Sequence, residues 1–295
     1  MNQGSEQRAE QDYPWINPIG GFGDMLMLSG VLKLVLEHEP ARRFNLIRRT
    51  NYLSILKGHP AIAGVGYPPK GAEIIGVDYW SREKLGSDNQ RAFQVLARIF
   101  GLSTPVDERL YIPELPGGNG ASLEDLIPWG NRNILIAPFS DSPRKVMHPA
   151  IWNRVVEHLY AQGMTIFQAG RLQEKHIRNA YSLRGLTTPR QLIALLGRFD
   201  AVITSDNFIM HAAHLAGARC VALWGPTQHE VYGYAGQFHI QMKPRCDETE
   251  GCISSRKNQG GTLYNSACPL GERHCMDQIR PEAAFDALKT ALLKK

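Results

Sequence analysis

A short run in the middle of the chain combines hydroxyl groups with positive charge. It reads SDSPRK (140–145) and comes shortly after the apolar stretch 133–137. The hydroxyls of Ser140 and Ser142 and the ammonium of Lys145 suit a pyrophosphate leaving group, because they neutralise the charge that develops as its bond to a sugar breaks. A solvated surface loop has the same composition, and taken alone the run favours that simpler interpretation.

A second group of polar residues follows the β-branched apolar run 201–204. Ser205 and Asp206 follow this run, a helical pattern comes next, and another apolar run spans 220–223. In open α/β sheets ligands bind at the carboxyl ends of strands, and a helix N-terminus offers unpaired N–H groups to phosphates. The unit therefore predicts a site for a phosphorylated ligand. The alternative is that Asp206 only caps the helix and that His211 is a packed core residue.

A glycine-rich loop, GGFGD at residues 20–24, separates the first apolar run from the first helical pattern. Glycines let the backbone pass close to a ligand, and Asp24 stands where a carboxylate can face a binding site. The loop is not a P-loop, and its glycine spacing differs from the dinucleotide-binding fingerprint. Asp24 thus has two interpretations of equal weight: a functional carboxylate, or an acid that stabilises the helix N-terminus.

Four of the five cysteines lie close together in a glycine-rich stretch, with five, fifteen and six residues between them: Cys246, Cys252, Cys268 and Cys275. Clustering of this kind in a segment poor in core residues indicates a cross-link. Thiolates around a tetrahedral metal, zinc or iron, are favoured over disulfides in a cytoplasmic protein. The spacing is not the paired CxxC of a zinc ribbon, so disulfides or free thiols stay open.

The scaffold for these residues is an alternation of strand-like and helix-like segments. This alternation is typical of parallel sheets built from right-handed crossovers. Strands are expected at 15–19, 44–48, 64–67, 73–77, 110–112, 133–137, 164–168, 201–204 and 220–223. Helices are expected at 24–39, 52–56, 89–100, 149–162, 174–182, 188–197, from just after Asp206 to Ala216, and 281–293.

A stretch rich in glycine and proline at 113–129 marks a linker. We therefore predict an α/β protein of two Rossmann-like domains whose parallel sheets face a central cleft. The expected parts are a disordered leader (1–12), a first domain (13–115), the linker (116–130), a second domain (131–280) that contains the cysteine-rich segment 246–275, and a C-terminal helix (281–295).

The composition is that of an ordinary globular protein, with 295 residues, 43% hydrophobic and 21% charged. No apolar run approaches the roughly 20 residues that span a bilayer, so any membrane association is expected to be peripheral. The polar N-terminus lacks the apolar core of a signal peptide, which predicts a cytoplasmic protein. A net charge of +5 fits an anionic substrate, an acidic membrane surface or nucleic acid, and does not distinguish them.

Taken together, these loops resemble the heptosyltransferases, family 9 of the GT-B glycosyltransferases. The order and approximate spacing hold from about residue 14 to residue 280. The chain departs from the usual pattern at Phe208, where a glycine is common, and at Met147, where a tryptophan is common. The residues that carry the resemblance are Gly23-Asp24, Lys145 with Pro149 and Trp152, Gly170 with Glu174, Asp206 with His211, Trp224-Gly225-Pro226-Thr227, and Cys268-Pro269-Leu270-Gly271 with Cys275.

The resemblance implies an inverting glycosyltransferase that uses a nucleoside-diphosphate sugar, with ADP-heptose favoured, and needs no divalent ion for catalysis. It implies that Asp24 is the general base on the acceptor domain, 13–115, and that the nucleotide sugar binds to the second domain. Some protein-glycosylating relatives bind iron through four cysteines, which strengthens the metal hypothesis. The implied donor-binding residues are Gly23, Ser140, Ser142, Lys145, Glu174, Thr187, Asp206, Asn207 and His211.

The acceptor is not specified by the sequence: lipopolysaccharide core, protein, a small molecule and DNA all carry hydroxyl groups. Two other functions fit parts of the pattern. One is a nonhydrolysing sugar-nucleotide epimerase, which pairs the same two domains around a UDP-sugar. The other is a non-catalytic protein that binds nucleic acid or a partner through the cysteines and through Arg42, Arg43, Arg48 and Arg49.

Overall fold

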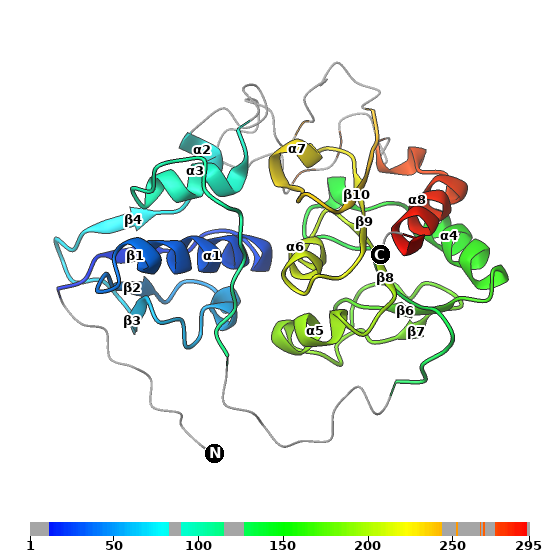
Figure 1. The fold of residues 1–295 in the computed structure, drawn as a ribbon, viewed down its shortest axis with the longest axis horizontal. Coiled ribbons are helices and arrows are strands. Elements are labelled where there is room, and N and C mark those ends of the chain that lie inside the picture. Colours follow the sequence, from blue (N-terminus) through cyan, green and yellow to red (C-terminus); the bar gives the residue numbers. More distant parts are fainter. Residues whose placement is uncertain are drawn as a thin grey trace. The chain divides into compact units, whose positions relative to one another are not determined.

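The structure is a computed structural model, and it describes residues 12–82, 90–114, 127–243, 252, 266, 268 and 275–293. The described residues fall into two compact units. The first holds residues 12–82 and 92–114, and the second holds residues 90–91 and those from 127 onward. Each unit contains its own parallel sheet flanked by helices (Figure 1).

The first unit is built on a four-stranded sheet with the order β3-β2-β1-β4. All of its strand pairs are parallel, and β1 lies between β2 and β4. The helix α1 follows β1 and buries most of its length, from Met25 to Val35. The strands are β1 (Trp15–Asn17), β2 (Phe44–Ile47), β3 (Ile62–Gly66) and β4 (Ile74–Gly76). The helices are α1 (Phe22–His38), the 3-10 turn η1 (Asn51–Ile55), α2 (Tyr79–Arg82) and α3 (Ala92–Ile99).

The second unit has a six-stranded parallel sheet with the order β10-β9-β8-β5-β6-β7. Its central strands are wholly buried, as their apolar runs predict. The strands are β5 (Asn133–Ala137), β6 (Thr165–Gln168), β7 (Tyr181–Ser182), β8 (Ala201–Ser205), β9 (Cys220–Trp224) and β10 (Phe238–Gln241). The helical segments are η3 (Pro143–Lys145), α4 (Pro149–Ala161), α5 (Pro189–Leu196), α6 (Phe208–Leu215), α7 (His229–Tyr232), η5 (Met276–Gln278) and α8 (Pro281–Leu293).

Helix α8 returns to pack beside α4 on the flank of the second sheet (Figure 1). The two helices share one apolar cluster, which includes Trp152 and Leu159 of α4 and Leu288 of α8. The helix expected at 281–293 is confirmed, and it is amphipathic: Ala284, Leu288 and Ala291 face this cluster. Among the described residues, no helix combines the length and apolarity that crossing a membrane requires.

The expected helix at 174–182 is wrong. This segment forms turns that end in the short strand β7. The buried Gln168 side chain explains the difference, because its amide binds the carbonyl of Lys175 and its oxygen accepts the N–H of Ile177. Asn179 then adopts a left-handed conformation with φ 61°, which a helix does not permit.

The expected strand at 110–112 is also wrong, because these residues join neither sheet. Instead the backbone near Arg109 and Leu110 packs against α1 at Gly30, where a Cβ atom would overlap the Arg109 carbonyl oxygen. The sequence analysis did not predict β10, α2 or α7.

Candidate active site

The strand order of the second sheet indicates where a ligand binds. Counted from the start of this unit, the order is 3-2-1-4-5-6, so the direction of the crossovers reverses between β5 and β8. In sheets of this type ligands bind outside the carboxyl ends of the strands at the reversal. The loop after β5 and the turn after β8 therefore form the expected site.

At this point the structure brings together Lys145 and Asp206, as the sequence analysis predicts. The Lys145 Nζ atom lies 2.8 Å from Oδ2 of Asp206, and the two side chains are only 12% and 6% exposed. The Thr227 hydroxyl donates to the same oxygen over 2.5 Å. The ring of Tyr232 lies 6.0 Å from the Lys145 ammonium. Because both partners of the ion pair are largely shielded from water, the ammonium is held in one place.

The helix α6 is capped by Asn207 and not by Asp206. The Asn207 side-chain oxygen accepts the N–H of Ile209 over 2.8 Å, while its amide donates to the carbonyls of Ala137 and Phe139. One side chain thus closes the helix N-terminus and fastens the loop after β5 to the turn after β8. The interpretation of Asp206 as a simple N-cap is wrong, and its carboxylate is used to orient Lys145 instead.

His211 lies inside α6 and is 6% exposed. Its Nδ1 atom is 2.8 Å from the hydroxyl of Tyr234. Burial lowers the pKa of His211 to about 4, although the nearby Asp206 carboxylate acts to raise it. The ring is therefore neutral at neutral pH. His211 is therefore a neutral hydrogen-bonding group within α6 rather than a cation for phosphate.

The loop after β5 is held from two sides. Ser142 is buried and Ser140 is half-buried. Asp141 pairs with Arg171 of the loop after β6. The buried Arg144 donates to the carbonyl and hydroxyl of Ser266 and to the sulfur of Cys252 at 3.4 Å. These contacts fix the backbone immediately before Lys145.

Glu174 lies in the loop after β6, half-buried. Burial raises the pKa of Glu174, while the backbone hydrogen bond from Arg171 acts in the opposite direction. Its carboxylate packs against Gly170, where φ is +150° and a Cβ atom would overlap Oε2. Thr187 is half-buried in the turn before α5. Both lie in the same unit as the Lys145–Asp206 pair.

In the first unit, Asp24 is in the first turn of α1, next to Gly23, and is half-buried. Its Oδ2 atom accepts the N–H of Gly21 over 2.7 Å, and its Oδ1 atom accepts the hydroxyl of Tyr79 over 2.6 Å. The interpretation of Asp24 as an acid that stabilises the helix N-terminus is therefore confirmed. The base assigned to this residue stays a prediction.

Comparison with known proteins decides the family. A model of glycosyltransferase family 9 (heptosyltransferase) matches residues 89–257, which is more than half of the chain. The chain belongs to glycosyltransferase family 9. A search of curated protein sequences finds no match.

Three solved structures show the same fold as this family 9 glycosyltransferase. The iron-containing dodecameric glycosyltransferase TibC from enterotoxigenic E. coli H10407 aligns with a TM-score of 0.68 and 16% identity, over 95% of this chain and 76% of TibC. E. coli ADP-heptose LPS heptosyltransferase II aligns with a TM-score of 0.64 and 13% identity, over 96% of this chain and 99% of its own.

A family 9 glycosyltransferase from Veillonella parvula DSM 2008 gives a TM-score of 0.67 and 15% identity, over 97% of this chain and 99% of its own. At these identities the likeness establishes the fold, which is the expected GT-B architecture of two parallel α/β sheets. The family match favours a glycosyltransferase over the epimerase and over the non-catalytic binding protein.

Two polar residues of the family 9 sites carry contacts that the sequence analysis did not assign. Thr227 appears there only within the motif after β9, and Tyr79 is not among the candidate site residues. In the structure Tyr79 is 3% exposed and bonds to Asp24. A threonine just after a buried strand was the available signal for the first, whereas no local pattern pairs Tyr79 with Asp24.

The cysteine cluster of this family 9 protein is described only in part, because Cys246 lies outside the described residues. Among the residues that are described, no three side chains of metal-binding type come together. The donation from Arg144 to the Cys252 sulfur suits a thiolate. Cys220 is separate: it is buried in β9, and burial raises its pKa to about 12.

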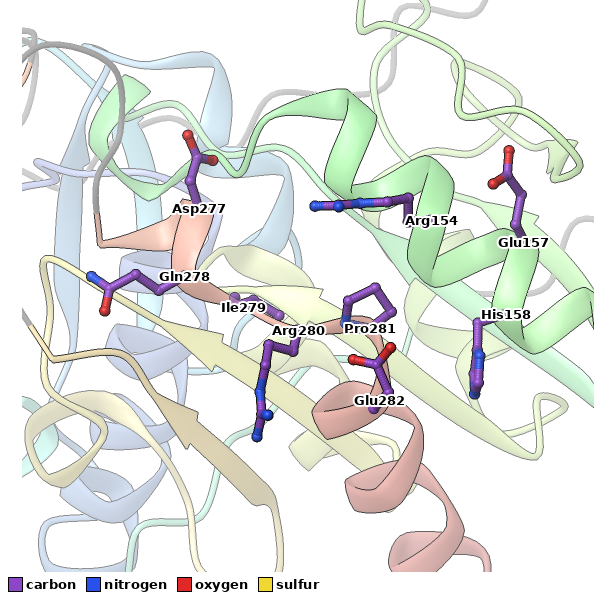
Figure 2. A pocket seen from close by; sticks show the side chains of 9 residues that line it. All are labelled: Arg154, Glu157, His158, Asp277, Gln278, Ile279, Arg280, Pro281 and Glu282. Atoms are coloured by element: carbon purple, nitrogen blue, oxygen red, sulfur yellow. The ribbon is translucent and has the colours of Figure 1, made fainter.

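A hollow of about 510 Å³ lies elsewhere in the second unit (Figure 2). It is lined by α4 and by the segment that leads from η5 into α8, and its side chains carry charges of both signs (Figure 2). Its lining residues are Arg154, Glu157, His158, Asp277, Gln278, Ile279, Arg280, Pro281 and Glu282. None of the described site residues is among them, so this hollow is not part of the candidate active site.

Proposed function

We propose that the chain transfers heptose or a related sugar, with inversion, from a nucleoside-diphosphate sugar to an acceptor hydroxyl. ADP-heptose is the favoured donor, because E. coli heptosyltransferase II is named for it and TibC has been solved with ADP-D-beta-D-heptose. The observation that carries the proposal is the shielded Lys145–Asp206 pair at the reversal point of the second sheet.

The second unit supplies the donor half of the reaction. An ammonium group donates in three directions, so Lys145 can be oriented by Asp206 and bind a phosphate oxygen at the same time. The backbone N–H groups at the start of α6 lie at the same edge of the sheet, and the N-terminus of a helix favours anions. In our proposal Lys145, with Ser140 or Ser142, stabilises the departing diphosphate, and Glu174 contacts the ribose.

The first unit supplies the acceptor half. The acceptor oxygen attacks the anomeric carbon and forms the new C–O bond, while the bond from that carbon to the diphosphate oxygen breaks and its electron pair leaves with the diphosphate. The proton of the acceptor hydroxyl passes to the Asp24 carboxylate. No divalent ion enters this step, because Lys145 and the backbone N–H groups carry the counter-charge.

The test replaces Asp24 by asparagine, which keeps the size of the side chain and its capacity to accept the Gly21 N–H. We expect transfer to fall at least about 100-fold, the lower range of a general base, while ADP-heptose binding measured by calorimetry stays unchanged. The matched control is Asp107→Asn on the same unit, whose carboxylate is 73% exposed and pairs with Arg109. Full activity of Asp24→Asn would refute the base.

We also propose that Cys246, Cys252, Cys268 and Cys275 hold zinc or iron. TibC is described as iron-containing, and the Arg144 contact suits a thiolate at Cys252. We assign this metal a structural role only. Elemental analysis of the purified protein should find about one metal atom per chain, and Cys252→Ser should lower that content while Cys220→Ser does not. Equal metal content in both variants would contradict the proposal.

A further inference from the structure

The first sheet has its own reversal point, between β1 and β4. Its strand order is 3-2-1-4, and the residues that follow the two strands at the reversal share one edge. Asp24 follows β1 in the first turn of α1, and Tyr79 follows β4 as the first residue of α2. The topology therefore brings together two residues that are 55 positions apart in the chain.

The contact between these residues is short and shielded. The Tyr79 hydroxyl donates to Oδ1 of Asp24 over 2.6 Å, and Tyr79 is 3% exposed. Its ring packs edge-on against Trp80, with 4.9 Å between the ring centroids. A hydrogen bond from a phenol to a carboxylate is charge-assisted, and burial strengthens it.

The two oxygens of Asp24 have different surroundings. Oδ2 accepts the Gly21 N–H, and the backbone of Gly20 packs so closely on it that a Cβ atom there would overlap the carboxylate. Gly20 has φ of +105°, which few other residues adopt. The glycine turn thus holds Oδ2, and Tyr79 holds Oδ1.

We propose that Tyr79 is a positioning residue for sugar transfer. Its hydroxyl donates to Oδ1 and so fixes the rotation of the Asp24 carboxylate, which takes the proton of the acceptor hydroxyl. The inference rests on the proposed function, since it requires Asp24 to be the base. The role of Tyr79 is thus that of a hydrogen-bond donor to the proposed base.

Two measurable effects follow when the hydroxyl is removed in Tyr79→Phe. A hydrogen bond to a carboxylate favours its ionised form, so its loss makes Asp24 hold a proton to higher pH. The acid limb of the kcat/KM profile should therefore move up by about one pH unit. Because the carboxylate can then rotate, kcat at the optimum should fall about 10- to 100-fold, while the KM for the donor stays unchanged.

The control variant is chosen from the groups in the same unit as Asp24. The glycine turn contributes the Gly21 N–H and α2 contributes Tyr79. The turn η1, which packs against α1, carries the titratable Tyr52, whose ring lies 4.7 Å from that of Phe22. Tyr111→Phe is the control, because it removes a phenol from the same unit at a ring that packs on His59. Thermal unfolding of each variant establishes that it is folded.

The experiment measures kcat/KM against pH for the wild type, Tyr79→Phe, Asp24→Asn, the double variant and Tyr111→Phe. We expect the acid limb of the kcat/KM profile to shift only in Tyr79→Phe. Adding Tyr79→Phe to Asp24→Asn should cause no further loss of kcat/KM. An active Asp24→Asn overturns the base and with it this inference. Asp24→Asn could be inactive while Tyr79→Phe keeps the acid limb of the wild type. In that case Asp24 remains the proposed base and the role of Tyr79 is overturned, whatever the kcat of Tyr79→Phe. In urea unfolding, the double variant should lose less free energy of unfolding than Tyr79→Phe and Asp24→Asn lose in sum. If the two losses simply add, this result also counts against the contact.

Discussion

At the scale of single residues, the two site carboxylates differ in access. The Asp206 side chain is 6% exposed, and its Oδ2 is enclosed by Lys145 and Thr227. Asp24 is half-buried and accepts from a phenol and a backbone amide. A general base must reach the proton it removes, whereas a carboxylate that orients a lysine need not touch substrate. This difference supports the proposal that Asp24 is the base and that Asp206 orients Lys145, the lysine proposed to bind phosphate.

Gly170 gives a prediction at the same scale. A Cβ atom there would overlap Oε2 of Glu174, and the φ of +150° disfavours any side chain. Gly170→Ala should displace the Glu174 carboxylate from the position at which we place the ribose. Losing a hydrogen bond to a charged group costs about 2 kcal/mol, so the KM for the donor should rise at least about 10-fold in steady-state assays.

The control for this prediction is Gly163→Ala at the end of α4. Gly163 also has a positive φ, of 76°, but a Cβ atom there meets nothing within 4 Å. This variant carries the backbone strain without the displacement, so it should lose about 1 kcal/mol of stability and keep the donor KM. A folded Gly170→Ala with the wild-type KM would remove Glu174 from the donor site.

At the scale of elements, the sequence predicts what depends on local pattern. The buried strands β5, β8 and β9 are continuous apolar runs, and α4 and α8 are amphipathic, so each is recognisable without its neighbours. The edge strand β10 reads FHIQ and is half-buried throughout, and an alternation of only four residues is too short to identify a strand without its neighbour β9. The segment 174–182 looks helical, but a buried glutamine from another strand forms its turns.

The residues of the candidate site also differ in how far local sequence patterns predict them. Lys145 and Asp206 are predictable, because Asp206 directly follows the recognisable strand β8, Lys145 lies in the loop after the recognisable strand β5, and parallel strands end at one edge. The contact of the Asn207 amide with the end of β5 and the contact of Tyr79 with Asp24 are not, because each depends on which strands are neighbours in the sheet. Strand order is a property of the assembled sheet and not of any single segment.

At the scale of the whole molecule, the described part of each unit contains a buried histidine in its neutral form. In the first unit His59 is 2% exposed, its Nε2 atom lies 3.0 Å from the Ser29 carbonyl, and its Nδ1 atom accepts the N–H of Ala61. In the second unit His211 bonds to Tyr234. Burial lowers the pKa of both residues to about 4, from an ordinary value of 6.5.

These two histidines make the free energy of unfolding depend on pH. Because their pKa is lower in the folded protein, the unfolded chain binds protons first, and stability falls as the pH drops from 6.5 toward 4. At pH 5 each should cost about 2 kcal/mol relative to pH 7.5, measured by urea unfolding. His211→Gln should remove about half of this loss, and His38→Gln, an exposed histidine at the end of α1, should remove none. A pH dependence that His211→Gln leaves unchanged would show that protonation of this ring does not limit stability in acid.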